Sequence, residues 1–163
     1  MMIKRPNFVL AIALSTMFAC SGNDTDPSDP QAFFNFTANG RSQTASGTSM
    51  DGDATNRSLT GPICNPFGGV NIQLREPLAI GAVPANQLLA ASYFEPNAQW
   101  DFLGPSYGPS QKGSGTVTLS AVTPRIIGTF QFTMVQLYPT AGGQITVQGS
   151  FNMDYAPRKV CPG

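Results

Sequence analysis

Carboxylates and serines are the side chains of this 163-residue chain whose chemistry could support catalysis. Two carboxylates about 5–10 Å apart can hydrolyse a glycosidic bond, and Ser110 or Ser114 could attack a substrate if a base activated it. The chain contains no histidine, which excludes Ser–His–Asp and Cys–His catalysis and imidazole metal sites. The candidate carboxylates are Glu76, Glu95, Asp101 and Asp154, and nothing in the sequence indicates which two of them would lie together.

Five aromatic side chains fall within residues 93–107 and could line a binding groove. Tyr93, Trp100 and Tyr107 would contact a sugar ring or an apolar ligand; alternatively, the rings pack in the core or against a loop. The stretch from Asp51 to Asn56 places oxygen ligands at alternate positions, as a calcium loop does, but it lacks the bidentate glutamate of an EF-hand. A surface turn uses the same residues, so we assign no metal and no cofactor.

The N-terminus has the composition of a secretory signal peptide. Lys4 and Arg5 precede an apolar run of 12 residues, residues 8–19, which is too short to span a bilayer. The run ends at Ala19-Cys20-Ser21-Gly22. This motif resembles the lipobox of bacterial lipoproteins, in which the cysteine is lipidated and becomes the new N-terminus. The alternative is an ordinary signal peptide that is cut near Cys20 and leaves a free thiol.

Residues 1–19 are therefore predicted to be a cleaved signal peptide, and residues 20–31 a lipidated cysteine followed by a flexible tether. Residues 21–31 have no aliphatic or aromatic side chain to bury. Palmitate and further acyl chains on Cys20 would hold the protein stably in a membrane. By the sorting rules that the lipobox resemblance implies, Ser21 permits the outer membrane, with the domain facing the periplasm or the cell surface.

Lipidation of Cys20 would leave two cysteines, Cys64 and Cys161. An even number of cysteines in a secreted chain indicates a disulfide, and this one would close a loop of about 100 residues. The alternative is two unrelated thiols. Because no Cys-x-x-Cys motif is present, the predicted disulfide is structural rather than redox-active.

The chain has few charges, and they balance. Charged residues are 11% of the sequence and the formal net charge is zero. Cleavage of residues 1–19 would remove Lys4 and Arg5 and leave seven basic and nine acidic residues, a net charge of −2. No basic patch is present, which excludes the usual electrostatic binding of nucleic acid.

Residues 113–155 have the clearest secondary-structure pattern, which predicts three consecutive antiparallel strands. In the middle strand, Ile126, Gly128, Phe130, Phe132 and Met134 fall on one face, and polar side chains fill most of the other. The last strand repeats this alternation over residues 144–153. A period of two residues is typical of a strand with one buried face and one face in water.

Shorter strands are expected upstream, at residues 32–38, 41–46, 54–60, 70–75, 88–94 and 99–103. The Gly and Pro positions predict a loop at 47–53, a stop at Gly61-Pro62, a turn at Pro66–Gly69, a connection at 77–85 and a flexible loop at 104–114. About eight to ten short strands indicate an all-β, antiparallel sandwich or barrel-like fold. Residues 32–163 would form this single domain, with a helix in the cleaved signal segment and almost none elsewhere.

Four short motifs occur in order along the domain. They are the Asn39-Gly40 hairpin, the Ile80-Gly81 segment, the Gly-Ser-Gly-Thr-Val-Thr-Leu stretch at 113–119 and the Gly-Thr-Phe-x-Phe-Thr strand at 128–133. In this order they resemble a family of small bacterial lipoproteins that carry a β-rich domain of unknown function. The resemblance covers most of residues 32–155, implies the fold, and implies no catalytic residues.

These observations favour a membrane-anchored, non-enzymatic protein that acts by binding or structural display, with a glycan, a lipid or an envelope protein as partner. One alternative is a carbohydrate- or lipid-binding module that uses the Trp100–Tyr107 region. A second alternative is a hydrolase that uses the carboxylates.

Overall fold

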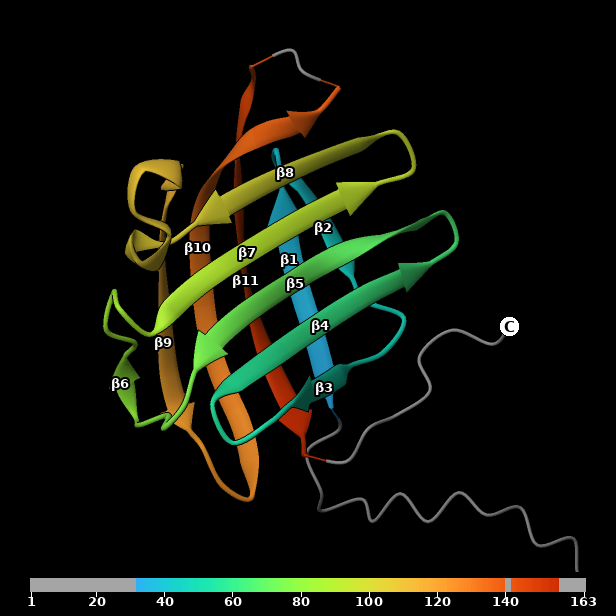
Figure 1. Ribbon diagram of the computed structural model, residues 1–163. Coiled ribbons are helices and arrows are strands. Elements are labelled where there is room, and N and C mark those ends of the chain that lie inside the picture. Colours follow the sequence, from blue (N-terminus) through green and yellow to red (C-terminus); the bar gives the residue numbers. More distant parts are fainter. Residues whose placement is uncertain (1–31, 140–141, 156–163) are drawn as a thin grey trace, which may run out of the picture.

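Eleven antiparallel strands and one short 3-10 helix make up most of the described chain, which comprises residues 32–139 and 142–155 of a computed structural model (Figure 1). The all-β fold expected from the sequence is confirmed. The predicted signal segment and tether, with Cys20, and also Cys161, lie outside the described residues. The elements are β1 (Phe33–Ala38), β2 (Arg41–Thr44), β3 (Ser49–Gly52), β4 (Asn56–Cys64), β5 (Phe67–Arg75), β6 (Gly81–Ala82), β7 (Leu88–Glu95), β8 (Ala98–Leu103), η1 (Pro105–Ser110), β9 (Ser114–Ala121), β10 (Arg125–Tyr138) and β11 (Gln144–Asp154).

The strands form one strongly curled sheet, a half-barrel, with β10 at its corner. The order along the sheet is β2-β1-β11-β10-β8-β7-β5-β4-β3, and β9 pairs with β10 and with the short β6. β10 pairs with β9 through residues 127–133 and with β8 through residues 135–138. Because β10 changes neighbour along its length, it joins two layers: in Figure 1, β4, β5, β7 and β8 cross obliquely in front of β1, β9, β10 and β11.

A phenylalanine cluster fills the space between the layers. Phe130 and Phe132 are buried, as the alternation in β10 predicts. The ring of Phe34 lies 5.4 Å from that of Phe130 and 5.8 Å from that of Phe151, measured between centroids. On the other layer, Phe102 of β8 contacts Phe132 at 5.2 Å. Such ring pairs contribute about 0.5–1.5 kcal/mol each beyond the burial of their area, so the aromatic face of β10 holds the layers together.

The expected strand stop at Gly61-Pro62 is wrong, because β4 runs through both residues to Cys64. A Cβ at Gly61 would lie 2.4 Å from the ring of Phe34, so this glycine makes room for the core rather than a turn. Pro62 lies beyond the last residue of β4 that pairs with β3, Thr60. Its missing N–H therefore leaves no hydrogen bond to β3 unmade, and its carbonyl accepts the Ser46 N–H at 2.8 Å.

Other segments expected to be loops also contain regular structure. β3 occupies the loop expected at 47–53, β5 begins inside the expected turn at Pro66–Gly69, and β6 lies in the connection expected at 77–85. The flexible loop expected at 104–114 contains η1. Pairing with a neighbouring strand stabilises the residues of β3, of β6 and of the start of β5, whose own strand propensity is weak. The local sequence pattern does not reveal this pairing.

Candidate functional site

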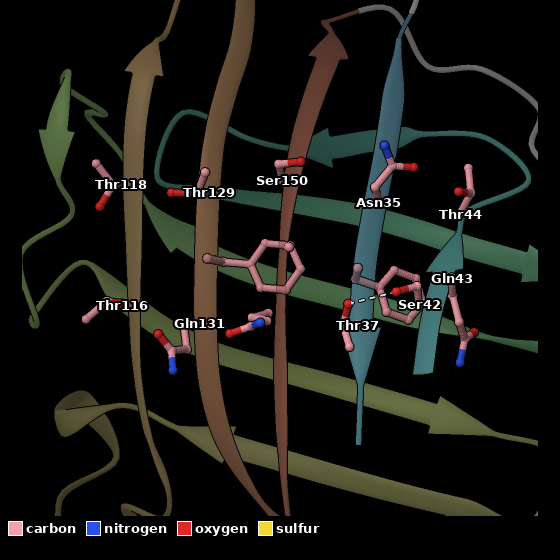
Figure 2. A pocket seen from close by; sticks show the side chains of 14 residues that line it. Asn35, Thr37, Ser42, Gln43, Thr44, Thr116, Thr118, Thr129, Gln131 and Ser150 are labelled. Atoms are coloured by element: carbon pink, nitrogen blue, oxygen red, sulfur yellow. Dashed lines mark hydrogen bonds between the residues drawn. The ribbon is translucent and has the colours of Figure 1, made fainter. Parts of the chain in front are cut away.

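Eleven uncharged polar residues line a hollow of about 680 Å³ on the outer face of the layer formed by β9, β10, β11, β1 and β2. One of them, Gln43, donates its amide to the Tyr93 hydroxyl, and the other ten form the site. Figure 2 draws these side chains, labels all of them except Gln148, and shows that they come from all five strands. We call this site the polar hollow. Its side chains are Asn35, Thr37, Ser42, Thr44, Thr116, Thr118, Thr129, Gln131, Gln148 and Ser150.

Strand register arranges these side chains in two rows that cross the sheet. One row is Thr118, Thr129, Ser150, Asn35 and Thr44, and the other is Thr116, Gln131, Gln148, Thr37 and Ser42. Neighbouring strands lie about 4.8 Å apart, and alternate residues of a strand lie about 6.7 Å apart. The rows therefore make a grid of hydroxyl and amide groups whose spacing is fixed by the sheet.

The sheet positions these groups because polar residues alternate with the core phenylalanines. Thr129 and Gln131 flank the buried Phe130 on β10, and Asn35 and Thr37 flank the buried Phe36 on β1. Successive side chains of a strand point to opposite faces. Packing of the rings in the core therefore holds the polar groups on the outside.

Most of the hydrogen-bonding capacity of the polar hollow is unused. Thr37 and Ser42 share a hydrogen bond between their hydroxyl oxygens at 3.4 Å (Figure 2). Within residues 32–139 and 142–155, the other eight side chains have no side-chain hydrogen-bond partner. Each hydroxyl can donate one hydrogen bond and accept two, and each amide can donate two and accept two.

A second hollow of about 400 Å³ continues the polar hollow along the strands. The two share Thr37 and Gln148, and the second extends past Thr146 to the turn between β1 and β2 at Asn39-Gly40. Together the two hollows form a hydrogen-bonding surface that extends along the strands, a shape that suits an extended ligand better than a compact metabolite.

The chemistry open to the polar hollow is hydrogen bonding. Hydroxyl and carboxamide side chains do not titrate in the physiological pH range, so the hollow offers no general base. Its ten groups match the needs of a neutral ligand that carries many hydroxyl or amide groups.

Sequence analysis did not single out this site. It predicted only that polar side chains lie on the exposed faces of the strands between residues 113 and 155. A usable signal was present, since hydroxyl and amide side chains recur on the outer faces of several strands with no lysine or glutamate among them. Which of them stand beside one another depends on strand order, which the alternation does not specify.

The structure brings two of the three predicted aromatic site residues together. Tyr93 of β7 and Trp100 of β8 are cross-strand partners whose rings stack with centroids 5.4 Å apart. Tyr93 is buried and Trp100 is half-buried against the core. Tyr107 lies on η1, which follows the C-terminal end of β8 (Figure 1). It therefore does not extend the surface formed by Tyr93 and Trp100. Ligand binding by Trp100 and Tyr107 stays a prediction.

Two polar neighbours hold the hydroxyl of Tyr93. Gln43 Nε2 donates a hydrogen bond to it at 3.2 Å, and it donates its own proton to Glu95 Oε1. Burial, together with the hydrogen bond to Glu95, raises the pKa of Tyr93 from 10.0 to about 12. The phenol is therefore neutral and fixed in direction at physiological pH.

The four carboxylates considered for hydrolysis have different partners. Glu76 accepts a hydrogen bond from Arg57 Nε at 3.0 Å, and Asp154 Oδ1 lies 3.1 Å from Arg125 Nε. Asp101 accepts from Gln99 Nε2 at 3.0 Å, and Glu95 accepts from Tyr93. Each carboxylate thus contacts a partner of its own, and none of these contacts joins two carboxylates as acid–base catalysis would require.

Residues Gly104–Gly108 have the Gly-x-Ser-x-Gly pattern. In a nucleophile elbow this pattern turns from a strand into an α-helix and presents the serine to a histidine. Here it leads from β8 into the 3-10 helix η1, and the Ser106 hydroxyl lies 3.5 Å from the carbonyl oxygen of Asn86. Because the chain has no histidine, the pattern lacks the usual base.

The Asp51–Asn56 stretch comprises the end of β3, a tight turn at residues 53–55 and the first residue of β4. Asp53 Oδ1 accepts hydrogen bonds from the backbone N–H groups of Thr55 and Asn56 at 2.7 and 2.9 Å, and from the Thr55 hydroxyl. The hydrogen bond from the Thr55 hydroxyl first, and then the two backbone bonds, lower the pKa of Asp53 to about 2. Over the described residues, no group of three or more His, Cys, Asp or Glu side chains could hold a metal ion.

Cys64 is the last residue of β4, and its predicted disulfide partner, Cys161, lies outside the described residues, as does Cys20. The lipidation and the disulfide stay predictions. Among the described residues, no helix is long and apolar enough to cross a membrane.

Comparison with known proteins finds no matching family model, no matching curated protein and no matching solved structure. The resemblance to a family of bacterial lipoproteins therefore stays a prediction.

Proposed function

We propose that this protein is a lipid-anchored binding module of the bacterial cell envelope, and that the polar hollow binds a neutral, hydroxyl-rich polymer such as an uncharged glycan. The observation that carries the proposal is the grid of ten uncharged side chains, eight of which have no side-chain partner in the described chain. The envelope location rests on the lipobox resemblance at Cys20.

The affinity for a glycan would come from many weak hydrogen bonds formed together. A hydrogen bond that replaces two bonds to water contributes a net of about 0.5–1.5 kcal/mol, so useful affinity requires several at once. The two rows, and the second hollow that extends them, offer such a set along an extended surface. The absence of formal charge among the ten residues disfavours polyanionic ligands, whose binding depends on Lys and Arg.

Gln131 and Gln148 provide the test because they lie opposite each other on β10 and β11, and both are exposed. Gln131→Ala and Gln148→Ala should each weaken binding of a neutral glycan by about two- to tenfold, the effect of one lost hydrogen bond. Binding is measured by calorimetry and affinity electrophoresis against panels of neutral and acidic polysaccharides.

The matched control is Gln73→Ala, an exposed glutamine of β5 on the outer face of the other layer. It should leave binding unchanged. Equal losses in all three variants, or preferential binding of acidic polysaccharides, would contradict the proposal.

A further inference from the structure

A second, smaller hollow lies where the curl of the sheet brings the β1–β2 hairpin close to the ends of the other layer. Its volume is about 370 Å³. Residues near the turns between β4 and β5 and between β7 and β8 form one wall, and β2 forms the other. We call this site the mouth cleft. Its volume falls within the range of small-molecule sites, about 300–1,000 Å³.

The apolar wall of the mouth cleft contains two aromatic rings. Phe67 and Phe94 lie with their ring centroids 5.5 Å apart, and Ile63 lines the same wall. Phe67 is 65% exposed, although it is among the largest apolar side chains of the domain. An exposed aromatic ring at the entrance of a hollow provides a contact surface for an apolar group.

The polar groups of the mouth cleft carry opposite charges that are not paired with each other. Glu95 is oriented by the hydrogen bond that its Oε1 accepts from Tyr93, and within the described residues its Oε2 has no partner. Arg41 also lines the cleft, and no ion pair or hydrogen bond occupies its guanidinium within that part of the chain. One fixed carboxylate and one guanidinium thus flank the apolar wall.

We infer that the mouth cleft binds a small zwitterion with an apolar side chain, the chemistry of an apolar amino acid or dipeptide. The ammonium group would bind Glu95, the carboxylate would bind Arg41, and the side chain would lie on Phe67 and Phe94. Hydrogen bonds between charged groups are shorter and stronger than neutral ones, and an ammonium group beside an aromatic ring gains cation–π attraction. This site is separate from the polar hollow, although Gln43 lines both.

The chain carries its own reporter for this site. Trp100 is the only tryptophan, and its ring stacks on Tyr93, whose hydroxyl is hydrogen-bonded to Glu95. A ligand on Glu95 should therefore change Trp100 fluorescence, and calorimetry gives a second, independent readout of binding.

The probes are L-phenylalanine and L-phenylalanyl-L-alanine, each compared with its N-acetylated and its C-amidated form. At least one zwitterion should bind, and blocking either terminus should weaken it by about tenfold or more, because each block removes one charge-assisted hydrogen bond. Glu95→Gln and Arg41→Gln should have the same effects on the free zwitterion, and Phe67→Ala should also weaken it.

Arg75→Gln is the matched control, since Arg75 is likewise an exposed arginine in a strand but lies outside the mouth cleft. It should bind the zwitterion as the unaltered protein does, and so should Gln131→Ala. The inference is overturned if neither zwitterion binds, if the blocked forms bind equally well, or if Glu95→Gln and Arg41→Gln have no effect. Failure of glycan binding at the polar hollow would not bear on this result.

Discussion

Tyr93 connects the core to the surface through one side chain. Its ring is buried and packs on Trp100, 5.4 Å away, while its hydroxyl reaches the mouth cleft between Gln43 and Glu95. Deprotonation would place a phenolate next to a carboxylate and remove the proton that Glu95 accepts. Burial of the side chain first, and then this hydrogen bond to Glu95, raise the pKa of Tyr93 to about 12, so the shift is a consequence of the fold.

The pKa of Tyr93 predicts a pH dependence of stability. A phenol whose pKa is raised by folding stabilises the folded state fully below pH 10, and this contribution is lost as the pH rises from 10 to about 12. The difference in unfolding free energy between the unaltered protein and Tyr93→Phe should therefore shrink over that range. Urea unfolding followed by Trp100 fluorescence between pH 9 and about 12 measures it, and a difference that does not vary with pH would contradict the prediction.

At the scale of elements, β4 shows how a strand can contain a glycine–proline pair. Gly61 lies against the ring of Phe34, and Pro62 lies where β4 no longer pairs with β3. Two residues that normally end a strand are thus placed where one provides space and the other needs no hydrogen bond. Gly69, opposite Pro62 on β5, has a φ of +138°, and a Cβ there would lie 2.5 Å from the Gly61 carbonyl oxygen.

Gly61→Ala should therefore destabilise the domain. The added methyl group would collide with the Phe34 ring, and overpacking of a core costs about 1–3 kcal/mol in unfolding free energy. Gly143→Ala is the control, because the nearest atom to its Cβ is the terminal oxygen of the Gln136 side chain, at 3.1 Å. Chemical denaturation compares the two, and similar stabilities would contradict this account of Gly61.

At the scale of the whole molecule, the half-barrel separates two kinds of surface. The outer face of β9, β10, β11, β1 and β2 carries the neutral polar hollow, whereas the mouth cleft between the layers carries charge and exposed rings. The strand β10 links the two layers, because it pairs with β9 at one end and with β8 at the other.

The described end of the chain bears on the predicted disulfide. Tyr155 lies near the start of β4, with the guanidinium carbon of Arg57 5.3 Å from its ring centroid, while Cys64 ends that strand. From Arg57 to Cys64, seven residues of strand span about 23 Å. Six residues of chain reach at most about 20–22 Å, and a disulfide bridges a further 5.5–6 Å or so between Cα atoms. The reach from Tyr155 through Cys161 and a disulfide is therefore comparable to the length of β4 between Arg57 and Cys64.

Mass spectrometry of the protein extracted from membranes tests both covalent predictions. We expect an N-terminal peptide acylated at Cys20 and, without reduction, a peptide pair joined through Cys64 and Cys161. Palmitate labelling should disappear in Cys20→Ser and persist in Cys64→Ser. Labelling that survives Cys20→Ser, or alkylation of both Cys64 and Cys161 without reduction, would show the corresponding prediction to be wrong.

The sequence alone determined the fold class and the buried faces of the longest strands. Phe130 and Phe132 alternate with Thr129 and Gln131, and this alternation depends only on neighbours two residues apart, so it can be read along the chain. The same local pattern misassigned Gly61-Pro62 and residues 47–53, because partners distant in the sequence stabilise strand there.

Only the tertiary structure decided which side chains meet. Asn35, Thr129 and Ser150 form one row of the polar hollow because β11 lies between β1 and β10, and Arg41 and Glu95 line one cleft because the sheet curls. Strand order and curl are set by long-range pairing and by the packing of the phenylalanine cluster. No local periodicity encodes either of them.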